Sequence, residues 1–118
     1  MIQAMNIHYL EIVTPDVNDM VSSYAESLDI SFSEPVLSLG GAYTAALSTG
    51  GMIGIRAPMH ESEEPVTRPY SLVDDIELSV ASAVKTGAIV ALPPTDISGY
   101  GKCAVLMQGG VQIGLWQM

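Results

Sequence analysis

Apolar and polar residues follow two different periods along this chain, and the two periods separate strands from helices. Residues 7–13 are rich in β-branched and aromatic side chains and end at Thr14-Pro15-Asp16, which predicts a strand stopped by a turn. Apolar residues then recur at helical spacing as far as Leu28, which predicts a helix that is capped by Asp16 or a neighbour and runs through Asp29. The rest of this half predicts an extended piece over 30–36, a strand over 42–47, a Gly50-Gly51 turn and a strand over 52–57.

The second half repeats the same order of patterns. It predicts a strand over 69–73, a helix over 76–86, an extended piece over 88–92, and strands over 102–107 and 111–117 around a Gly109-Gly110 turn. At an offset of 59 residues, Leu47 and Gly50-Gly51 coincide with Leu106 and Gly109-Gly110. Chance similarity among glycines and aliphatic residues is the alternative to a true repeat. The recurrence of helix, turn and final strand in one order favours a repeat.

The repeat predicts the domain organisation. Each half reads βαβββ, with module 1 at about 1–57, a polar, acidic linker at 58–67 and module 2 at about 68–118. A unit of this size covers its own sheet poorly, so we expect the two modules to pair in one domain over 1–118. The predicted fold class is α+β, with a curved mixed sheet, a concave cup and helices on the outer face. Pairing within the chain and swapping across a dimer both remain open.

Three segments carry a resemblance to a known family. They are Leu10-Glu11-Ile12-Val13-Thr14-Pro15-Asp16, Leu72-Val73-Asp74-Asp75-Ile76 and Gly109-Gly110-Val111-Gln112-Ile113-Gly114-Leu115-Trp116. In order and spacing the chain resembles the vicinal oxygen chelate superfamily, which includes glyoxalase I, bleomycin-resistance proteins and extradiol dioxygenases. The resemblance covers nearly the whole chain. It implies the paired-module fold but does not fix the chemistry.

The resemblance also implies four positions for the ligands of a divalent metal ion, usually His, Glu or Gln. In this sequence they fall on Tyr9, Gly54, Arg68 and Gly114. Two of these residues have no side chain, one is cationic and one is a phenol with a high pKa, so none is a good ligand. A register slip of one residue would bring in His8, but a lone histidine cannot make this site. We therefore expect no metal and no other cofactor, which puts metal-dependent lyase or dioxygenase activity in doubt.

Strand alternation predicts which other side chains face the cup, because residues two apart share a face. Leu10, Ile12, Ile53 and Ile55 are the expected helix-side residues. The expected ligand-binding residues are Tyr9, Gly54, Arg56, Arg68, Gln112, Gly114 and Trp116, with Glu11 and Tyr70 on the same faces. An aromatic lining with a few polar groups is typical of a small-molecule pocket.

Each of these residues has a functional and a structural interpretation. Arg56 and Arg68 could bind a ligand carboxylate, phosphate or carbonyl group, or one of them could pair with Glu11. Glu11 and Tyr70 are the candidate catalytic base and acid, although structural pairing of Glu11 with an arginine is the alternative.

The aromatic residues of the predicted cup are also open to two interpretations. Tyr9, Tyr70 and Trp116 could stack on a planar ligand or fill the space that Gly54 and Gly114 leave. The two glycines could instead enlarge the cavity or let a ligand approach the backbone.

Composition narrows the partners. A net charge of −9, from 4 basic and 13 acidic residues, disfavours nucleic acid and anionic membranes. A single cysteine excludes an internal disulfide and suits a reducing compartment. The first five residues carry no basic region or long apolar run, so we expect no signal peptide and a cytoplasmic location. The resemblance implies a homodimer.

Two functions therefore stand. The first is a metal-independent binding protein of the bleomycin-resistance or glyoxalase-like type, which takes an aromatic or anionic organic molecule. The alternative is a glyoxalase-like lyase, isomerase or dioxygenase-type enzyme that acts on a small oxygenated substrate with an atypical or absent metal site.

Overall fold

The computed structural model describes residues 4–118, which form two compact units. Residues 1–3 lie outside the described residues. They belong to the first five residues, on which the expectation of no signal peptide rests. One unit is Tyr9–Thr67, and the other combines residues 4–8 with Arg68–Met118. None of the helices within 4–118 has the length and apolar character needed to cross a membrane.

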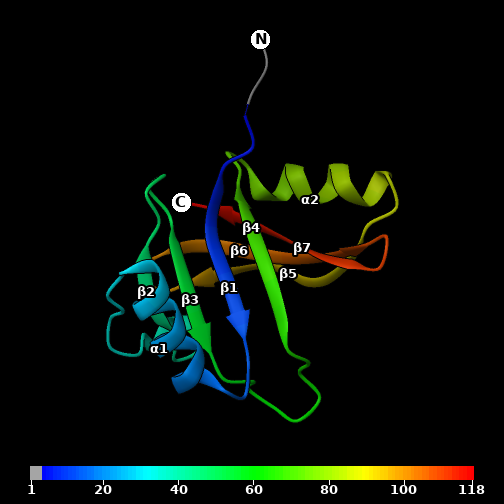
Figure 1. Ribbon diagram of the computed structural model, residues 1–118. Coiled ribbons are helices and arrows are strands. Elements are labelled where there is room, and N and C mark those ends of the chain that lie inside the picture. The colour runs from blue at the N-terminus through cyan, green and yellow to red at the C-terminus, as the bar shows by residue number, and fades with distance from the viewer. Residues whose placement is uncertain (1–3) are drawn as a thin grey trace. The chain divides into compact units, whose positions relative to one another are not determined.

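The unit Tyr9–Thr67 packs one helix on a small mixed sheet (Figure 1). Its elements are β1 (Ile7–Val13, from Tyr9 onward), α1 (Val17–Leu28), the short 3-10 helix η1 (Leu37–Leu39), β2 (Tyr43–Ala46) and β3 (Met52–Arg56). β3 pairs with β1 in parallel and with β2 in antiparallel fashion. The core contains Ile12, Ala45, Ile53 and Ile55, against which the apolar stripe of α1 packs.

The second unit has the same helix-on-sheet construction with one more strand (Figure 1). Its elements are β4 (Val66–Leu72, from Arg68 onward), α2 (Ile76–Lys85), β5 (Ile89–Ile97), β6 (Gly101–Gln108) and β7 (Val111–Gln117). β7 pairs with β4 in parallel and with β6 in antiparallel fashion, and β5 adds to β6. The core contains Ile76, Ala88, Ala104, Leu106 and Leu115.

Within residues 4–118 the α+β class is confirmed by the α-helices α1 and α2 and by strands that pair both in parallel and in antiparallel fashion. The predicted strand faces hold in β1 and β3, because Ile12, Ile53 and Ile55 pack toward α1 with Leu10 beside them. The division into 1–57, 58–67 and 68–118 and the cup shared by two modules remain predictions.

One element of the βαβββ reading of module 1 is wrong, the extended piece predicted over 30–36. Residues 30–36 form no strand, and an isolated bridge between Val36 and Ala42 is the β pairing recorded there. Ser33 N donates to Thr44 O at 2.7 Å. Thr44 N, however, donates to the Ser33 hydroxyl oxygen at 3.1 Å, and this side-chain bond replaces the next bond of the ladder. Pro35 has no N–H to continue the ladder.

The second module extends two strands beyond their predicted ends. β4 begins at Val66, three residues earlier than the pattern predicts. β5 continues through Pro93-Pro94 to Ile97, with register shifts around the prolines. An edge strand tolerates prolines because its outer side needs no N–H donors.

The two helix starts give a matched test of capping. Asp75 Oδ1 accepts a hydrogen bond from Leu78 N at 3.1 Å, whereas Asp16 makes no side-chain capping bond to α1. Asp75→Ala should therefore lower the free energy of unfolding by about 1 kcal/mol, and Asp16→Ala by clearly less. Urea unfolding of both variants measures the difference, and equal losses would contradict it.

Candidate functional site

The predicted site residues fall into two groups, one in each unit. Tyr9, Glu11, Gly54 and Arg56 lie on β1 and β3 of Tyr9–Thr67. Arg68, Tyr70, Gln112, Gly114 and Trp116 lie on β4 and β7 of the other unit. The register places Glu11 beside Gly54 in the first group and Tyr70 beside Gly114 in the second.

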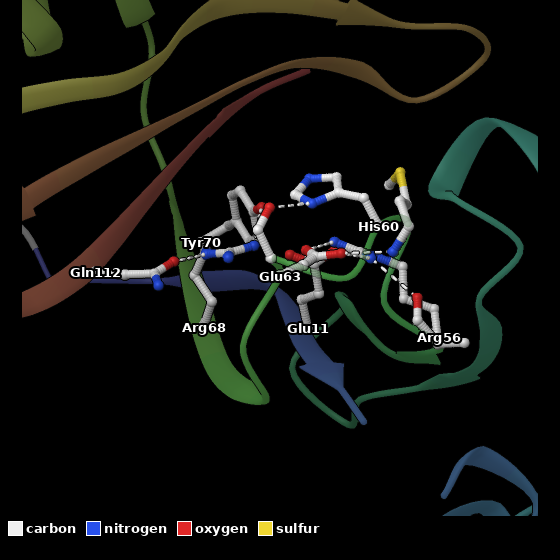
Figure 2. Close-up of polar contacts among 10 residues, drawn as sticks. Glu11, Arg56, His60, Glu63, Arg68, Tyr70 and Gln112 are labelled. Atoms are coloured by element: carbon white, nitrogen blue, oxygen red, sulfur yellow. Dashed lines mark hydrogen bonds and ion pairs between the residues drawn. The ribbon is translucent and has the colours of Figure 1, made fainter. Parts of the chain in front are cut away.

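Arg56 is buried between two carboxylates of its own unit (Figure 2). Its Nε donates to Glu11 Oε2 at 2.8 Å, which is the pairing given as the structural alternative for both residues. Its Nη1 and Nη2 donate to the two oxygens of Glu63 at 2.9 and 2.7 Å, and Nη1 also donates to Ala57 O at 3.1 Å. A guanidinium bound in this bidentate way is both neutralised and fixed in orientation.

The surroundings of Arg56 act on its pKa in opposite directions. Burial removes water from the cation and lowers the pKa, but the hydrogen bonds and negative charges of Glu63 and Glu11 together outweigh this effect and raise the pKa above the ordinary value. Arg56 is therefore a permanent cation. Because its side chain is only 4% exposed, the charge depends on these two partners for its solvation.

Arg68 is the buried cation of the other unit, and two polar side chains of its own sheet hold it. Its Nε donates to Gln112 Oε1 at 2.6 Å, and its Nη1 donates to the Tyr70 hydroxyl at 3.3 Å (Figure 2). Gln112 is half-buried, whereas Arg68 and Tyr70 are buried. β4 and β7 thus bring together three of the predicted ligand-binding or catalytic residues.

Each unit also packs a tyrosine ring over a glycine. A Cβ built on Gly54 would lie 2.6 Å from Tyr9 Cζ, and one built on Gly114 would lie 2.5 Å from Tyr70 Cδ2. Such distances are far below van der Waals contact, so both glycines are needed to make room for the rings. Of the two interpretations of these residues, filling the space left by glycine is the one present in each unit.

Trp116 is 3% exposed and packs within its own unit. Its ring lies edge-on to Tyr70 at 5.5 Å between centroids and beside His8 at 5.7 Å, and its Nε1 donates to Tyr100 O at 2.9 Å. Indole burial with a satisfied N–H is typical of a packed aromatic residue. Trp116 therefore packs against the Tyr70 ring and helps to fix its position.

Sequence reasoning missed Glu63. It lies in the segment predicted as an exposed linker, where alternation gives no information about faces. The signal that could have found it is chemical: a buried arginine needs counter-charge, and three glutamates follow Arg56 within eight residues.

Two surface hollows lie at the amino ends of the helices. One of about 390 Å³ lies beside Asp16 and Ala57, and one of about 610 Å³ lies beside Asp75 and Leu72. None of the predicted site residues lines either hollow.

Comparison with known proteins finds relatives whose sequence similarity covers only part of each chain. No family model matches the chain. A Mycobacterium bovis protein named "Putative glyoxylase CFP32" is 33% identical over 88 residues, which are 70% of this chain and 34% of that protein. A Mycobacterium tuberculosis protein of the same name gives the same values. The chain therefore spans about a third of the length of these curated relatives.

Solved structures match over nearly the whole chain. Hypothetical protein BH1468 from Bacillus halodurans superimposes with a TM-score of 0.77 at 16% identity, covering 98% of this chain and 96% of that one. Methylmalonyl-CoA epimerase from Mycobacterium tuberculosis gives a TM-score of 0.70 at 16% identity, covering 99% and 92%. The chain has the vicinal oxygen chelate fold. The fold implied by the resemblance is thereby confirmed.

The family resemblance implies a divalent metal, and the residues of each unit can be tested against it. In Tyr9–Thr67 the two positions that the resemblance implies are Tyr9 and Gly54, and the tyrosine ring occupies the space that a side chain at 54 would need. In the other unit they are Arg68, a cation bound to Gln112, and Gly114, which the Tyr70 ring covers. Within residues 4–118 no group of three or more His, Cys, Asp or Glu side chains could hold a metal ion. The residues present do not fit the family's metal.

Proposed function

We propose that this protein is a metal-independent small-molecule binding protein of the vicinal oxygen chelate fold, and that its ligand is an organic anion, aromatic or carrying a carboxylate. The proposal rests on the residues that stand, in both units, where the family has its metal ligands. Two glycines accommodate two tyrosine rings, and an arginine stands at a third position. Where a metal ion would polarise ligand oxygens, these residues offer a guanidinium, an amide and a phenol.

Arg68, Tyr70 and Gln112 are the proposed ligand-binding group. Gln112 and Tyr70 fix the orientation of the guanidinium through Nε and Nη1, so little side-chain entropy is lost when a ligand binds. Similar structures support an anionic ligand, since methylmalonyl-CoA epimerases with this fold have been solved with methylmalonyl-CoA and with 2-nitronate-propionyl-CoA. We also propose that the protein is a cytoplasmic homodimer, as the resemblance implies.

An enzyme of glyoxalase-like or epimerase-like type is the second candidate, with Glu11 as base and Tyr70 as acid. The names of the structural neighbours favour it. The ion pair of Glu11 weighs against it, because the carboxylate is buried and accepts a hydrogen bond from Arg56 Nε at 2.8 Å. A base bound in this way must first break an ion pair before it can accept a proton.

A thermal-shift screen with a matched pair of variants tests the proposed function. Benzoate, and other small carboxylates, should raise the melting temperature of the wild type more than their neutral amides do, because the guanidinium prefers an anion. Arg68→Gln should weaken this response, whereas Lys85→Gln, which removes one charge from an exposed position, should leave it unchanged.

The same screen includes nickel, zinc, manganese and iron(II). None of these metals should bind stoichiometrically or change the response to benzoate. Tight metal binding, or a carboxylate response that Arg68→Gln leaves intact, would contradict the proposed function.

A further inference from the structure

Residues 58–65 form a strap that connects β3 to β4 without regular secondary structure. Of its residues only Pro58 and Glu63 are half-buried, and the other six are exposed. The strap therefore buries little apolar surface, and hydrophobic burial contributes little to holding it in place.

The strap is anchored through the carboxylate of Glu63. This group accepts hydrogen bonds from Arg56 Nη1 and Nη2 at 2.9 and 2.7 Å, and from Met59 N at 2.7 Å (Figure 2). The strap also has its own internal order, with Glu63 N donating to His60 O at 3.1 Å and Ser62 Oγ lying 2.6 Å from His60 Nδ1. It can thus keep its shape while its contact with Arg56 changes.

We propose that the Nη1–Nη2 edge of Arg56 is a carboxylate-binding site that Glu63 occupies from within the chain, and that a ligand carboxylate displaces Glu63 and releases the strap. This inference rests on the proposed function for the anionic nature of the ligand. It adds a second carboxylate-binding group and names its resident occupant.

The geometry favours exchange. Arg56 keeps Glu11 on Nε whichever carboxylate occupies the other edge, so the cation stays paired and oriented throughout. An incoming carboxylate offers the same two oxygens as Glu63, so the number of negative charges facing Arg56 does not change. Released Glu63 moves into water, where its charge is solvated.

The strap holds the Glu63 carboxylate close to Arg56, and a ligand must compete with this tethered carboxylate. A carboxylate on a short flexible segment competes with an effective concentration of roughly millimolar order. A free acetate ion exceeds this only at high concentration, whereas a ligand with further contacts can exceed it at low concentration. The strap would thus exclude simple anions and admit a larger organic acid.

Chemical rescue tests the site without the natural ligand. Glu63→Ala should lower the melting temperature by on the order of 5 °C. Acetate should then restore at least half of this loss by occupying the vacated edge of Arg56, while chloride at equal ionic strength should not. Glu64→Ala is the matched control, since it removes an exposed neighbouring carboxylate of the same strap.

A second measurement follows the strap itself. The Met59 methyl group lies beside Gly40, so its NMR resonance should shift when the strap is released. Benzoate should shift the wild-type resonance toward its position in Glu63→Ala, and Arg56→Met should show no acetate rescue.

Equal acetate effects in Glu63→Ala and Glu64→Ala, stronger rescue by phosphate than by acetate, or an unmoved Met59 resonance would overturn the inference. Failure of the Arg68→Gln test with successful acetate rescue would instead reject the proposed function and leave the Arg56 site standing.

Discussion

Replacing Arg56 with methionine is expected to lower the free energy of unfolding by about 3–5 kcal/mol, the usual cost of removing one partner from a buried ion pair. Arg56 is 4% exposed, and Glu11 beside it has a side chain only 8% exposed, so the variant leaves a carboxylate in a poorly solvated position. Urea unfolding followed by circular dichroism measures the loss. Lys85→Met, which removes an exposed cation, should change stability by less than about 0.5 kcal/mol.

The ion-pair account also predicts a recovery. Adding Glu11→Gln to Arg56→Met removes the buried negative charge that has lost Arg56, so the double variant should be more stable than Arg56→Met alone. If Arg56→Met instead costs less than about 1 kcal/mol, the buried pair is not a major contact of this unit.

Adding a methyl group at Gly54 is expected to destabilise the protein by about 1–3 kcal/mol, as overpacking of a filled core does. Glycine to alanine in a strand would otherwise stabilise, because alanine has less freedom to lose on folding. At Gly54 the new Cβ meets the Tyr9 ring at 2.6 Å, and this ring is 3% exposed with little space to move.

A double-variant cycle isolates the contact. In a Tyr9→Ala background, Gly54→Ala should lose its penalty, because the ring is no longer there. Gly114→Ala should be rescued only in part by Tyr70→Ala, since its Cβ also meets the main-chain Pro69 O at 2.7 Å. Equal penalties for Gly54→Ala with and without Tyr9 would contradict the proposed packing of ring on glycine.

The fold was largely predictable because the spacing of apolar residues, which distinguishes helices from strands, is a local property of the sequence. β1 and β7 match their predicted ranges, and the start of α2 follows from Asp75 at its amino end. The extended piece predicted over 30–36 forms no strand, because Pro35 and the Ser33 side chain break the ladder, which depends on pairing partners rather than on apolar period. β5 exceeds its predicted end because its edge position tolerates Pro93-Pro94.

The sequence predicted which face of the sheet the candidate residues lie on, but not which residues they bind. Alternation predicted that Glu11 and Arg56, which lie on two different strands, face the same side, and their ion pair was the structural alternative for both residues. The bond from Arg68 to Gln112 joins residues 44 positions apart in sequence. The bidentate contact of Glu63 with Arg56 spans only seven residues, but Glu63 lies in a segment without regular secondary structure. Local patterns carry no information about such pairs, since they depend on how the chain folds back.

Calorimetric titration of the best carboxylate from the screen into protein stripped with EDTA tests metal-independent binding most directly. The account predicts the same affinity before stripping, after stripping and after zinc or nickel is added back, because guanidinium and amide groups hold the ligand. Binding that disappears on stripping and returns with the metal would contradict it.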